Sequence, residues 1–207
     1  MNNKKIIILA DGNYPTHSIP CELLKSGLPV VCCDGAANRY VAEGGTPFAI
    51  IGDGDSVAPH IKERCAHCFH PVAEQENNDL TKAVNFIASL GETDITILGA
   101  TGKRECHTLG NISLLIDYHR RELNVRMLTD HCEIRPCQGK QSFTTVIGQQ
   151  ISIINFGAKN FDSTGLRYPI YDFSTWWQGT LNEATDTLVT IEADGEYLVL
   201  LDYPEMS

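Results

Sequence analysis

The chain places two aspartates one glycine apart, directly after an apolar run. Asp53 and Asp55 flank Gly54 and follow Pro47-Phe48-Ala49-Ile50-Ile51. In an extended chain, side chains at this spacing lie on one side, and Gly54 allows the backbone to turn so that both carboxylates converge. Because two close carboxylates repel each other, a bound cation is their natural partner. The motif therefore predicts a Mg²⁺ site, with a plain Asp-Gly surface turn as the alternative.

Glycine and polar residues also end three other predicted strands. These ends read Ala10-Asp11-Gly12-Asn13, Asp34-Gly35-Ala36-Ala37-Asn38 and Gly99-Ala100-Thr101-Gly102. Ligands of open parallel sheets bind beyond the carboxyl ends of the strands. We therefore expect one site at this edge, which Asp34 approaches from a neighbouring strand, with tight strand-to-helix connections as the alternative. The candidate binding residues from these loops are Gly12, Asn13, Asn38, Gly99, Thr101 and Gly102.

A third acid begins a predicted helix. In Asn77-Asn78-Asp79-Leu80-Thr81-Lys82, an asparagine caps the helix and Asp79 in the first turn suits the helix dipole. Lys82 lies one turn later on the same face. Capping and a surface ion pair are sufficient reasons for both residues when they are considered alone. Next to the paired aspartates, Asp79 is a third acid for the predicted metal site.

The stretch from Gly99 to His107 combines glycine with basic residues. It is not a P-loop, because Ile97 stands where that motif needs its first glycine and Arg104 where it needs serine or threonine. A glycine loop that opens a helix can still hold phosphates through backbone amides and a guanidinium. The candidate phosphate-binding residues here are Lys103, Arg104, His107 and Asn111.

Short apolar segments alternate with helical patterns over the first 130 residues or so, which predicts a parallel sheet covered on both faces. The expected strands are Lys5–Leu9, Pro29–Cys33, Phe48–Ile51, His67–Pro71, Ile95–Leu98 and Val125–Thr129. The expected helices are Ser18–Lys25, Ala36–Glu43, Asp79–Leu90 and Leu109–Glu122. We interpret residues 1–132 as an α/β, doubly wound, Rossmann-like domain.

The pattern changes after about Cys132, where short strand-like segments replace the helical period. The segments Thr187–Glu192 and Glu196–Leu201 flank Ala193-Asp194-Gly195, which predicts a β-hairpin because Asp-Gly favours the turn. We interpret residues 133–207 as a second, all-β sandwich domain.

Bulk composition limits the class of protein. A net charge of −10 without a basic cluster argues against a nucleic-acid-binding protein. No apolar run approaches the length of a membrane span, and the first apolar run is followed by Asp-Gly-Asn, not by a cleavage site. We expect a cytoplasmic protein with free thiols. Cys65 and Cys68 resemble half of a zinc site, but no second ligand pair completes it.

Taken in order, these motifs resemble the thiamin pyrophosphokinase family. The motifs that carry the resemblance are Asp34-Gly-Ala-Ala-Asn38, Gly52-Asp-Gly-Asp-Ser56, Asn78-Asp-Leu-Thr-Lys-Ala83 and the stretch from Gly99 to Asn111. Further along, Gly165-Leu-Arg-Tyr-Pro169 and Gly179-Thr-Leu-Asn-Glu183 are similar to motifs of the family's β-domain. The resemblance covers nearly the whole chain.

The resemblance implies a homodimer with active sites at the subunit interface, and transfer of a pyrophosphoryl group from ATP to the hydroxyl of thiamin. It implies that Asp53, Asp55 and Asp79 hold Mg²⁺, with Asp34 close to the metal and phosphates. The residues that it implies for charge neutralisation are Lys82 and Arg104, and those for thiamin are Asn182 and either Trp176 or Trp177. Such transfer depends mainly on positioning and charge stabilisation.

Three residues depart from the family pattern. Lys103 replaces a glycine, Cys106 replaces an aspartate and Leu181 replaces a serine. Two alternatives therefore remain open: the same chemistry on another alcohol such as a hydroxymethylpterin, or a nucleotide-binding or sensing protein without turnover.

Overall fold

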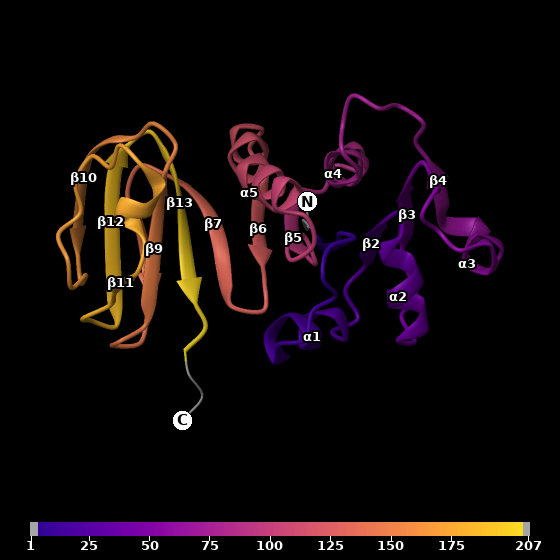
Figure 1. The fold of residues 1–207 in the computed structure, drawn as a ribbon, viewed down its shortest axis with the longest axis horizontal. Coiled ribbons are helices and arrows are strands. Elements are labelled where there is room, and N and C mark those ends of the chain that lie inside the picture. Colours follow the sequence, from indigo (N-terminus) through magenta and orange to yellow (C-terminus); the bar gives the residue numbers. More distant parts are fainter. Residues whose placement is uncertain (1–3, 205–207) are drawn as a thin grey trace. The chain divides into compact units, whose positions relative to one another are not determined.

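The computed structural model describes residues 4–204, which cluster into two units. The first contains the described residues up to 114 together with residues 121–130. The second contains residues 115–120 and the described chain from residue 131 onward. Figure 1 shows the ribbon coloured along the sequence. Within residues 4–204, no helix has the length and apolar character that crossing a membrane requires.

Strands rich in Val and Ile form a parallel sheet in the first unit. Their order is β4-β3-β2-β1-β5-β6, and each neighbouring pair runs parallel. In the centre, Ile7 pairs with Val30 on one side and Thr96 on the other. The strands are β1 (Lys5–Leu9), β2 (Val30–Cys33), β3 (Ala49–Gly52), β4 (Phe69–Pro71), β5 (Asp94–Leu98) and β6 (Asn124–Leu128).

Helices cover both faces of this sheet, as continuous burial of the strands requires. The helices are α1 (Ser18–Leu24), α2 (Ala36–Ala42), α3 (Pro59–Arg64), α4 (Asp79–Ser89) and α5 (Glu105–Arg120). Leu24, Tyr40 and Ile61 of α1, α2 and α3 share one core cluster with Ile7 of β1. Helix α4 contacts β1, β2 and β3 and buries Ile87, which is outside that cluster, so it covers the opposite face.

The predicted doubly wound fold is confirmed, and most predicted elements differ from the observed ones only at their ends. Two differences go further. Helix α3, which begins with Pro59 at a first-turn position, was not predicted, because six residues are too few to show a clear helical period. Helix α5 begins at Glu105, four residues before the predicted Leu109, since its polar first turn does not carry the apolar pattern.

The second unit is a β-sandwich, as predicted. One sheet has the order β11-β9-β13-β7 and the other β10-β12-β8, with antiparallel pairs throughout. Phe161, Tyr197 and Ile153 belong to its buried core. The strands are β7 (Cys132–Gln138), β8 (Gln141–Thr144), β9 (Gln150–Asn155), β10 (Lys159–Thr164), β11 (Asn182–Glu183), β12 (Leu188–Asp194) and β13 (Glu196–Asp202).

The predicted hairpin around Asp194-Gly195 is wrong. Strand β12 pairs with β10 and β8, whereas β13 pairs with β7 and β9, so the two strands belong to different sheets. Gly195 alone separates them and has a φ of +123°. A Cβ at this position would lie 2.9 Å from the Cα of Ala158. The Asp-Gly dipeptide therefore bends the chain from one layer of the sandwich to the other.

Candidate active site

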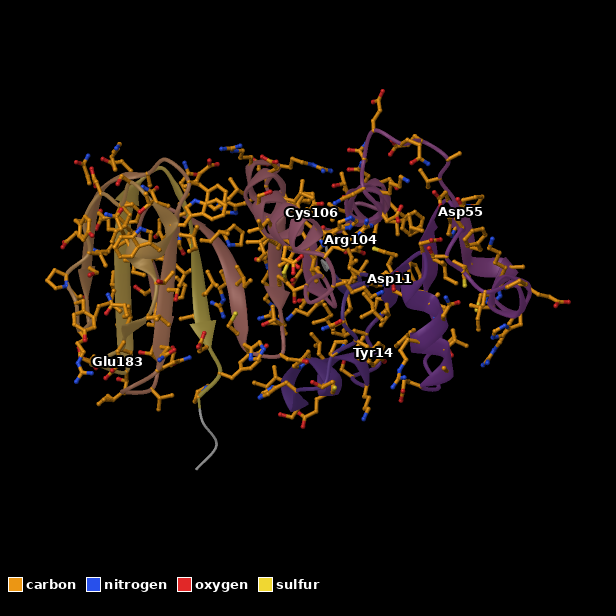
Figure 2. The ribbon with its side chains drawn as sticks, in the orientation of Figure 1. Asp11, Tyr14, Asp55, Arg104, Cys106 and Glu183 are labelled. Atoms are coloured by element: carbon orange, nitrogen blue, oxygen red, sulfur yellow. The ribbon has the colours of Figure 1, made fainter. Side chains whose placement is uncertain are left out.

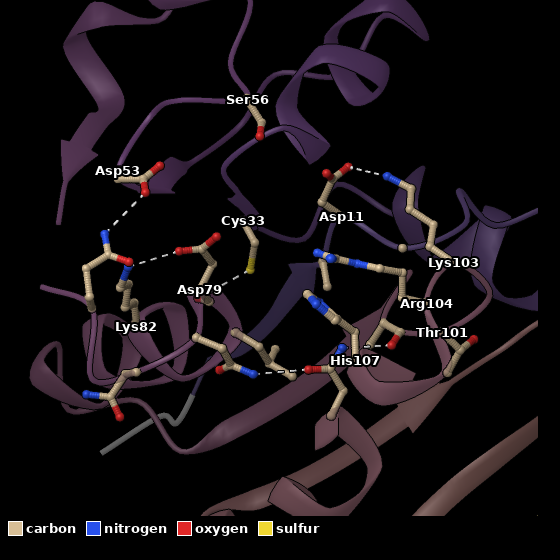
Figure 3. Close-up of a pocket in the computed structure, with 18 residues that line it drawn as sticks. Asp11, Cys33, Asp53, Ser56, Asp79, Lys82, Thr101, Lys103, Arg104 and His107 are labelled. Carbon is tan, nitrogen blue, oxygen red and sulfur yellow. Dashed lines mark hydrogen bonds and ion pairs between the residues drawn. The ribbon is translucent and has the colours of Figure 1, made fainter. Parts of the chain in front are cut away.

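A pocket of about 400 Å³ lies at the carboxyl ends of the parallel strands of the first unit (Figure 3). Its walls come from the loops after β1, β3, β4 and β5, from Cys33 at the end of β2, and from the N-terminal parts of α4 and α5. The chain proceeds from β1 through β2 and β3 to β4, then returns to β5 on the other side of β1. The pocket therefore occupies the switch point at which open α/β sheets bind their ligands.

The structure brings part of the predicted site into this pocket. The predicted residues that line it are Gly12, Asp53, Asp79, Lys82, Thr101, Lys103, Arg104, His107 and Asn111. The predicted residues of the first unit that do not line it are Asn13, Asp34, Asn38, Asp55, Gly99 and Gly102. Most of this second group forms hydrogen bonds with residues that line the pocket. Asn38, for example, accepts a hydrogen bond from Ala58 N and donates one to Ser56 O, which fixes the loop after β3.

Asp34 is a buried carboxylate directly after β2. Its Oδ2 accepts a hydrogen bond from Ser56 N at 3.0 Å, whereas its Oδ1 is buried without a hydrogen-bond partner among the described residues. Burial raises the pKa of this carboxyl above its ordinary value, and the charges of Asp79 and Asp53 act in the same direction against the Ser56 hydrogen bond. A buried oxygen without a partner is costly, which makes Asp34 a candidate neighbour of a cation.

Asp53 and Asp55 take different positions in the turn after β3. Asp53 lines the pocket and its Oδ1 accepts a hydrogen bond from Asp55 N at 3.0 Å. This hydrogen bond, followed by a weaker one from Gln75, lowers the pKa of the Asp53 carboxyl. Asp55 is exposed and does not line the pocket. Figure 2 labels Asp55 within this loop.

The first turn of α4 carries an acid–base pair. Lys82 Nζ lies 3.2 Å from Asp79 Oδ1, and the Lys82 side chain is only 3% exposed. Asn78 caps the helix by accepting a hydrogen bond from Thr81 N, and it also donates to Asn111 Oδ1. Asn111 in turn donates to Ala100 O. These bonds fix the start of α4 against the loop after β5.

The loops after β1 and β5 touch through their backbones. Gly12 N donates to Gly99 O at 2.6 Å and Asn13 N donates to Thr101 O at 2.8 Å. A Cβ at Gly12 would lie 2.3 Å from Gly99 O, so this approach requires glycine. The two loops therefore form one rigid wall.

Basic side chains project from this wall into the pocket. Lys103, Arg104 and His107 line it, and Lys103 Nζ lies 3.1 Å from Asp11 Oδ1. In Figure 3 the acids from the loop after β3 and from α4 lie across the pocket from Arg104 and His107. Carboxylates and cations that face one pocket suit a polyphosphate that arrives with a metal ion.

The carboxylates of the pocket are ligands of the kind that Mg²⁺ prefers, but they do not form a complete coordination shell. Carboxylate oxygens are hard ligands, and a nearby cation would stabilise the unpartnered Asp34 Oδ1. Within residues 4–204, no group of three or more His, Cys, Asp or Glu side chains could by itself hold a metal ion. Asp53, Asp55 and Asp79 are therefore not gathered as a three-carboxylate site. Mg²⁺ often uses one or two protein carboxylates and completes its shell with water and substrate phosphates.

Sequence reasoning missed several residues that line the pocket, namely Asp11, Cys33, Ser56, Gln75, Asn77 and Asn78. Asp11 lies two residues after the end of β1. Asp34 was selected because polar residues after parallel strands face a ligand site, and the same reasoning would have selected Asp11. Gln75 carries no such signal, because it reaches Asp53 from the segment between β4 and α4.

In the second unit, Asn182 is buried and its side chain is engaged. Its Oδ1 accepts hydrogen bonds from Tyr168 N and Glu183 N, and its Nδ2 donates to Tyr168 O. The side chains of Trp176 and Trp177 are 47% and 75% exposed. Trp176 packs on Phe156 with ring centroids 5.5 Å apart. Trp177 therefore offers the freer aromatic face.

The other two departures from the family pattern lie on the surface. Cys106 is exposed in the first turn of α5 and does not line the pocket; Figure 2 labels it beside Arg104. Leu181 is 69% exposed and has a φ of +60°, a backbone region that leucine rarely adopts. Cys65 and Cys68 are buried free thiols.

Two family models match the chain. Residues 21–127 match the model described as thiamin pyrophosphokinase, catalytic domain. Residues 134–200 match the model described as thiamin pyrophosphokinase, substrate-binding domain.

Relatives and solved structures agree with these matches. The chain is 27% identical to thiamine pyrophosphokinase 1 of Oryza sativa subsp. japonica, across 81% of this chain and 76% of the rice protein. A crystal structure of thiamine pyrophosphokinase from Bacillus subtilis superposes with a TM-score of 0.83 at 21% identity, covering 98% of this chain and all of that one. A yeast thiamin pyrophosphokinase superposes with a TM-score of 0.82 at 14% identity, covering 98% and 87%. These structural likenesses show a shared fold.

Proposed function

Because this chain belongs to the thiamin pyrophosphokinase family, whose known activity is ATP-dependent pyrophosphoryl transfer to thiamin, we propose that its first unit binds ATP in the pocket at the carboxyl ends of the parallel strands. The hydroxyethyl oxygen of thiamin forms a bond to the β-phosphorus of ATP. The bond between that phosphorus and the oxygen that bridges it to the α-phosphorus breaks, and AMP leaves with this oxygen. The hydroxyl proton is lost from the attacking oxygen. The products are thiamin diphosphate and AMP.

The observation that carries this proposal is the opposition of charges within one pocket. Asp53 and Asp79 lie on the side of the loop after β3 and of α4, and Arg104 and His107 project from the start of α5. Lys82 is buried beside Asp79, so its charge is held at a fixed position. Preorganised cations are effective at neutralising charge on a phosphoryl group, because they need no rearrangement during the reaction.

Each group has a proposed part. Asp53 and Asp79, which line the pocket, would hold Mg²⁺, with Asp55 of the same turn as a third candidate ligand. Asp34 lies near enough for the charges of Asp53 and Asp79 to raise its pKa. When bound, Mg²⁺ supplies positive charge to the polyphosphate. Lys82 and Arg104 neutralise phosphate oxygens. Backbone amides of the loops after β1 and β5 bind phosphate oxygens, apart from those of Gly12 and Gly102, which already donate to Gly99 O and Thr108 Oγ1. Asn13 and Asn111 hold these loops in place, and Asn38 holds the loop after β3.

The proposed division of labour follows the two family matches. We assign residues 1–132 as the catalytic, nucleotide-binding domain and residues 133–207 as the domain for thiamin binding and dimerisation. The matches at residues 21–127 and 134–200 support the catalytic and substrate-binding parts of this assignment. Trp177, which is 75% exposed, is the better candidate for stacking on an aromatic ring of thiamin. Asn182 positions the backbone around Tyr168 and Glu183 through its three hydrogen bonds.

The test of this function measures AMP released from ATP and Mg²⁺ with thiamin, compared with a hydroxymethylpterin as acceptor. We expect AMP and thiamin diphosphate in equal amounts with thiamin, and no AMP with the pterin. AMP release with the pterin alone would assign a different acceptor. ATP binding without AMP release in either reaction would support a binding or sensing role.

A substitution of the paired aspartates tests the metal assignment. We expect Asp55→Asn and Asp53→Asn each to lower turnover at least about a hundredfold, because an amide is a poorer Mg²⁺ ligand than a carboxylate. The measurement is AMP release over a Mg²⁺ titration, together with thermal unfolding to show that the variants fold. Asp162→Asn, an exposed residue of β10, is the matched control. Near-normal turnover of Asp55→Asn would remove Asp55 from the metal site while leaving Asp53 to be judged by its own variant.

A further inference from the structure

An ion pair joins two loops of the pocket at a position where this chain departs from the family motif. Lys103 Nζ lies 3.1 Å from Asp11 Oδ1, and the two side chains are 53% and 46% exposed. Both residues line the pocket, Lys103 from the loop after β5 and Asp11 from the loop after β1 (Figure 3). The family motif has glycine at the position of Lys103, so this pair is a feature of the present chain.

Asp11 is the fixed member of the pair. Its Oδ2 packs against Gly35 so closely that a Cβ on that glycine would lie 3.0 Å from this oxygen. The loop that carries Asp11 is bonded to the loop after β5 through Gly12 N and Asn13 N. Lys103, by contrast, carries its charge on a flexible four-carbon stem. The ammonium group can therefore leave Asp11 without any change of the backbone.

The position and exposure of Lys103 distinguish it from the other lysine of the pocket. Lys82 is 3% exposed and lies beside Asp79, so burial holds its ammonium group at one position. The pair of Lys103 with Asp11 is exposed on both sides, and such pairs are weak. A polyphosphate carries several charges and binds an ammonium group more strongly than a single carboxylate does.

From this geometry we infer that the Asp11–Lys103 pair sets the affinity for the nucleotide, with Asp11 competing against the phosphates of ATP for the ammonium group of Lys103. The inference rests on the proposed ATP site. Lys103 is an affinity residue for phosphate, and Asp11 is a positioning residue that acts through it. Removing Asp11 then strengthens nucleotide binding, whereas removing Lys103 weakens it.

The experiment measures binding of α,β-methylene-ATP with Mg²⁺ by calorimetry. A methylene group replaces the oxygen between the α- and β-phosphorus atoms of this analogue, so the proposed transfer cannot occur during the measurement. We expect Asp11→Asn to bind it about two- to fivefold more tightly, which corresponds to the loss of a weak competing pair. Lys103→Met should bind it roughly tenfold less tightly, and Lys103→Arg should restore most of the affinity. The double variant should bind like Lys103→Met, because Asp11 acts only through Lys103.

The control separates this effect from a general change of charge. Glu192→Gln changes the net charge as Asp11→Asn does and breaks a similar exposed pair with Lys140 in the second unit. We expect its affinity for the analogue to equal that of the wild type. The gain from Asp11→Asn should shrink as salt is raised, since a competition between charges is screened.

The opposite signs of the two single variants decide between competition and a structural clamp. If the pair only holds the two loops together, Asp11→Asn and Lys103→Met weaken binding equally and lower the thermal unfolding temperature equally, which would overturn the inference. Unchanged affinity in both variants would overturn it as well. If the wild-type protein binds no analogue, the proposed ATP site itself fails, a result that differs from the other two.

Discussion

Asp34 combines features that a carboxylate retains only at some cost to the fold. It has a φ of +40°, its side chain is buried, and Oδ1 lacks a hydrogen-bond partner among the residues described. Burial disfavours its charged form and raises its pKa. Strain and unpaired charge of this kind are typical of functional sites, where stability is lower than the fold alone would allow.

We expect Asp34→Asn to stabilise the free protein and to reduce its turnover. The amide oxygen can still accept the hydrogen bond from Ser56 N, asparagine tolerates a positive φ, and the buried charge is gone. The free energy of unfolding should rise by about 1 kcal/mol at neutral pH. Chemical denaturation measures the stability, and AMP release measures turnover. A variant that is less stable than the wild type would contradict the account of Asp34 as a costly buried charge.

The pH dependence of this difference has a definite sign. The folded state raises the pKa of Asp34 above its ordinary value of 3.8, so it holds the proton more tightly than the unfolded chain does. The stability of the wild-type protein therefore falls as pH rises from about that ordinary value through the raised pKa. Asp34→Asn lacks this loss. Its advantage should be absent in strong acid, grow through that window and then become constant.

At the scale of elements, the pocket depends on how closely the loops after β1 and β5 approach. Gly12 allows this approach because no side chain separates it from Gly99 O. The two loops follow the neighbouring central strands β1 and β5. These strands pair continuously from Lys5 opposite Asp94 to Leu9 opposite Leu98. The register of two buried strands thus determines where the backbone amides proposed to bind phosphate lie.

Substitution of two glycines with different surroundings tests this dependence. We expect Gly12→Ala to destabilise the protein by about 2 kcal/mol and to weaken nucleotide binding, because the new Cβ would overlap Gly99 O and Thr101 O. Gly110→Ala, in α5, meets no atom within 4 Å and should stabilise the protein by roughly 0.5–1 kcal/mol. Denaturant unfolding and calorimetry with α,β-methylene-ATP provide both measurements. Equal effects of the two substitutions would show that the loop contact is unimportant.

At the scale of the whole molecule, each of the two units has its own hydrophobic core. The second unit exposes large apolar side chains, among them Trp177 at 75%, Leu181 at 69% and Ile147 at 69%. Contiguous exposed apolar surface is common where proteins associate. The homodimer that the family resemblance implies remains a prediction.

We expect sedimentation equilibrium to give a mass of twice the 22.8 kDa of the chain at micromolar concentration. Burial of apolar surface between two copies supplies the driving force. A dilution series should show dissociation toward the single-chain mass. A mass of one chain throughout the series would exclude the homodimer and leave the exposed side chains of the second unit to another explanation.

The sequence by itself determined most elements of the first unit and the edge of the sheet at which the candidate site lies. Strand β1 was predicted with its observed ends, and Asp53, Asp79, Lys82 and Arg104 were all placed at one site. These predictions succeed because burial on two faces leaves a local apolar pattern, and because parallel strands bring their carboxyl ends to the same edge.

Only the tertiary structure decided which side chains meet. Residues 11 and 103 are far apart in sequence, and their pairing follows from the adjacency of β1 and β5. The separation of β12 and β13 into two sheets likewise depends on partners elsewhere in the chain, whereas the Asp-Gly pattern between them suits a hairpin equally well. A local pattern indicates whether a segment forms a helix or a strand and where the chain turns. Which strands then pair depends on packing over the whole unit, and a local pattern carries no information about that packing.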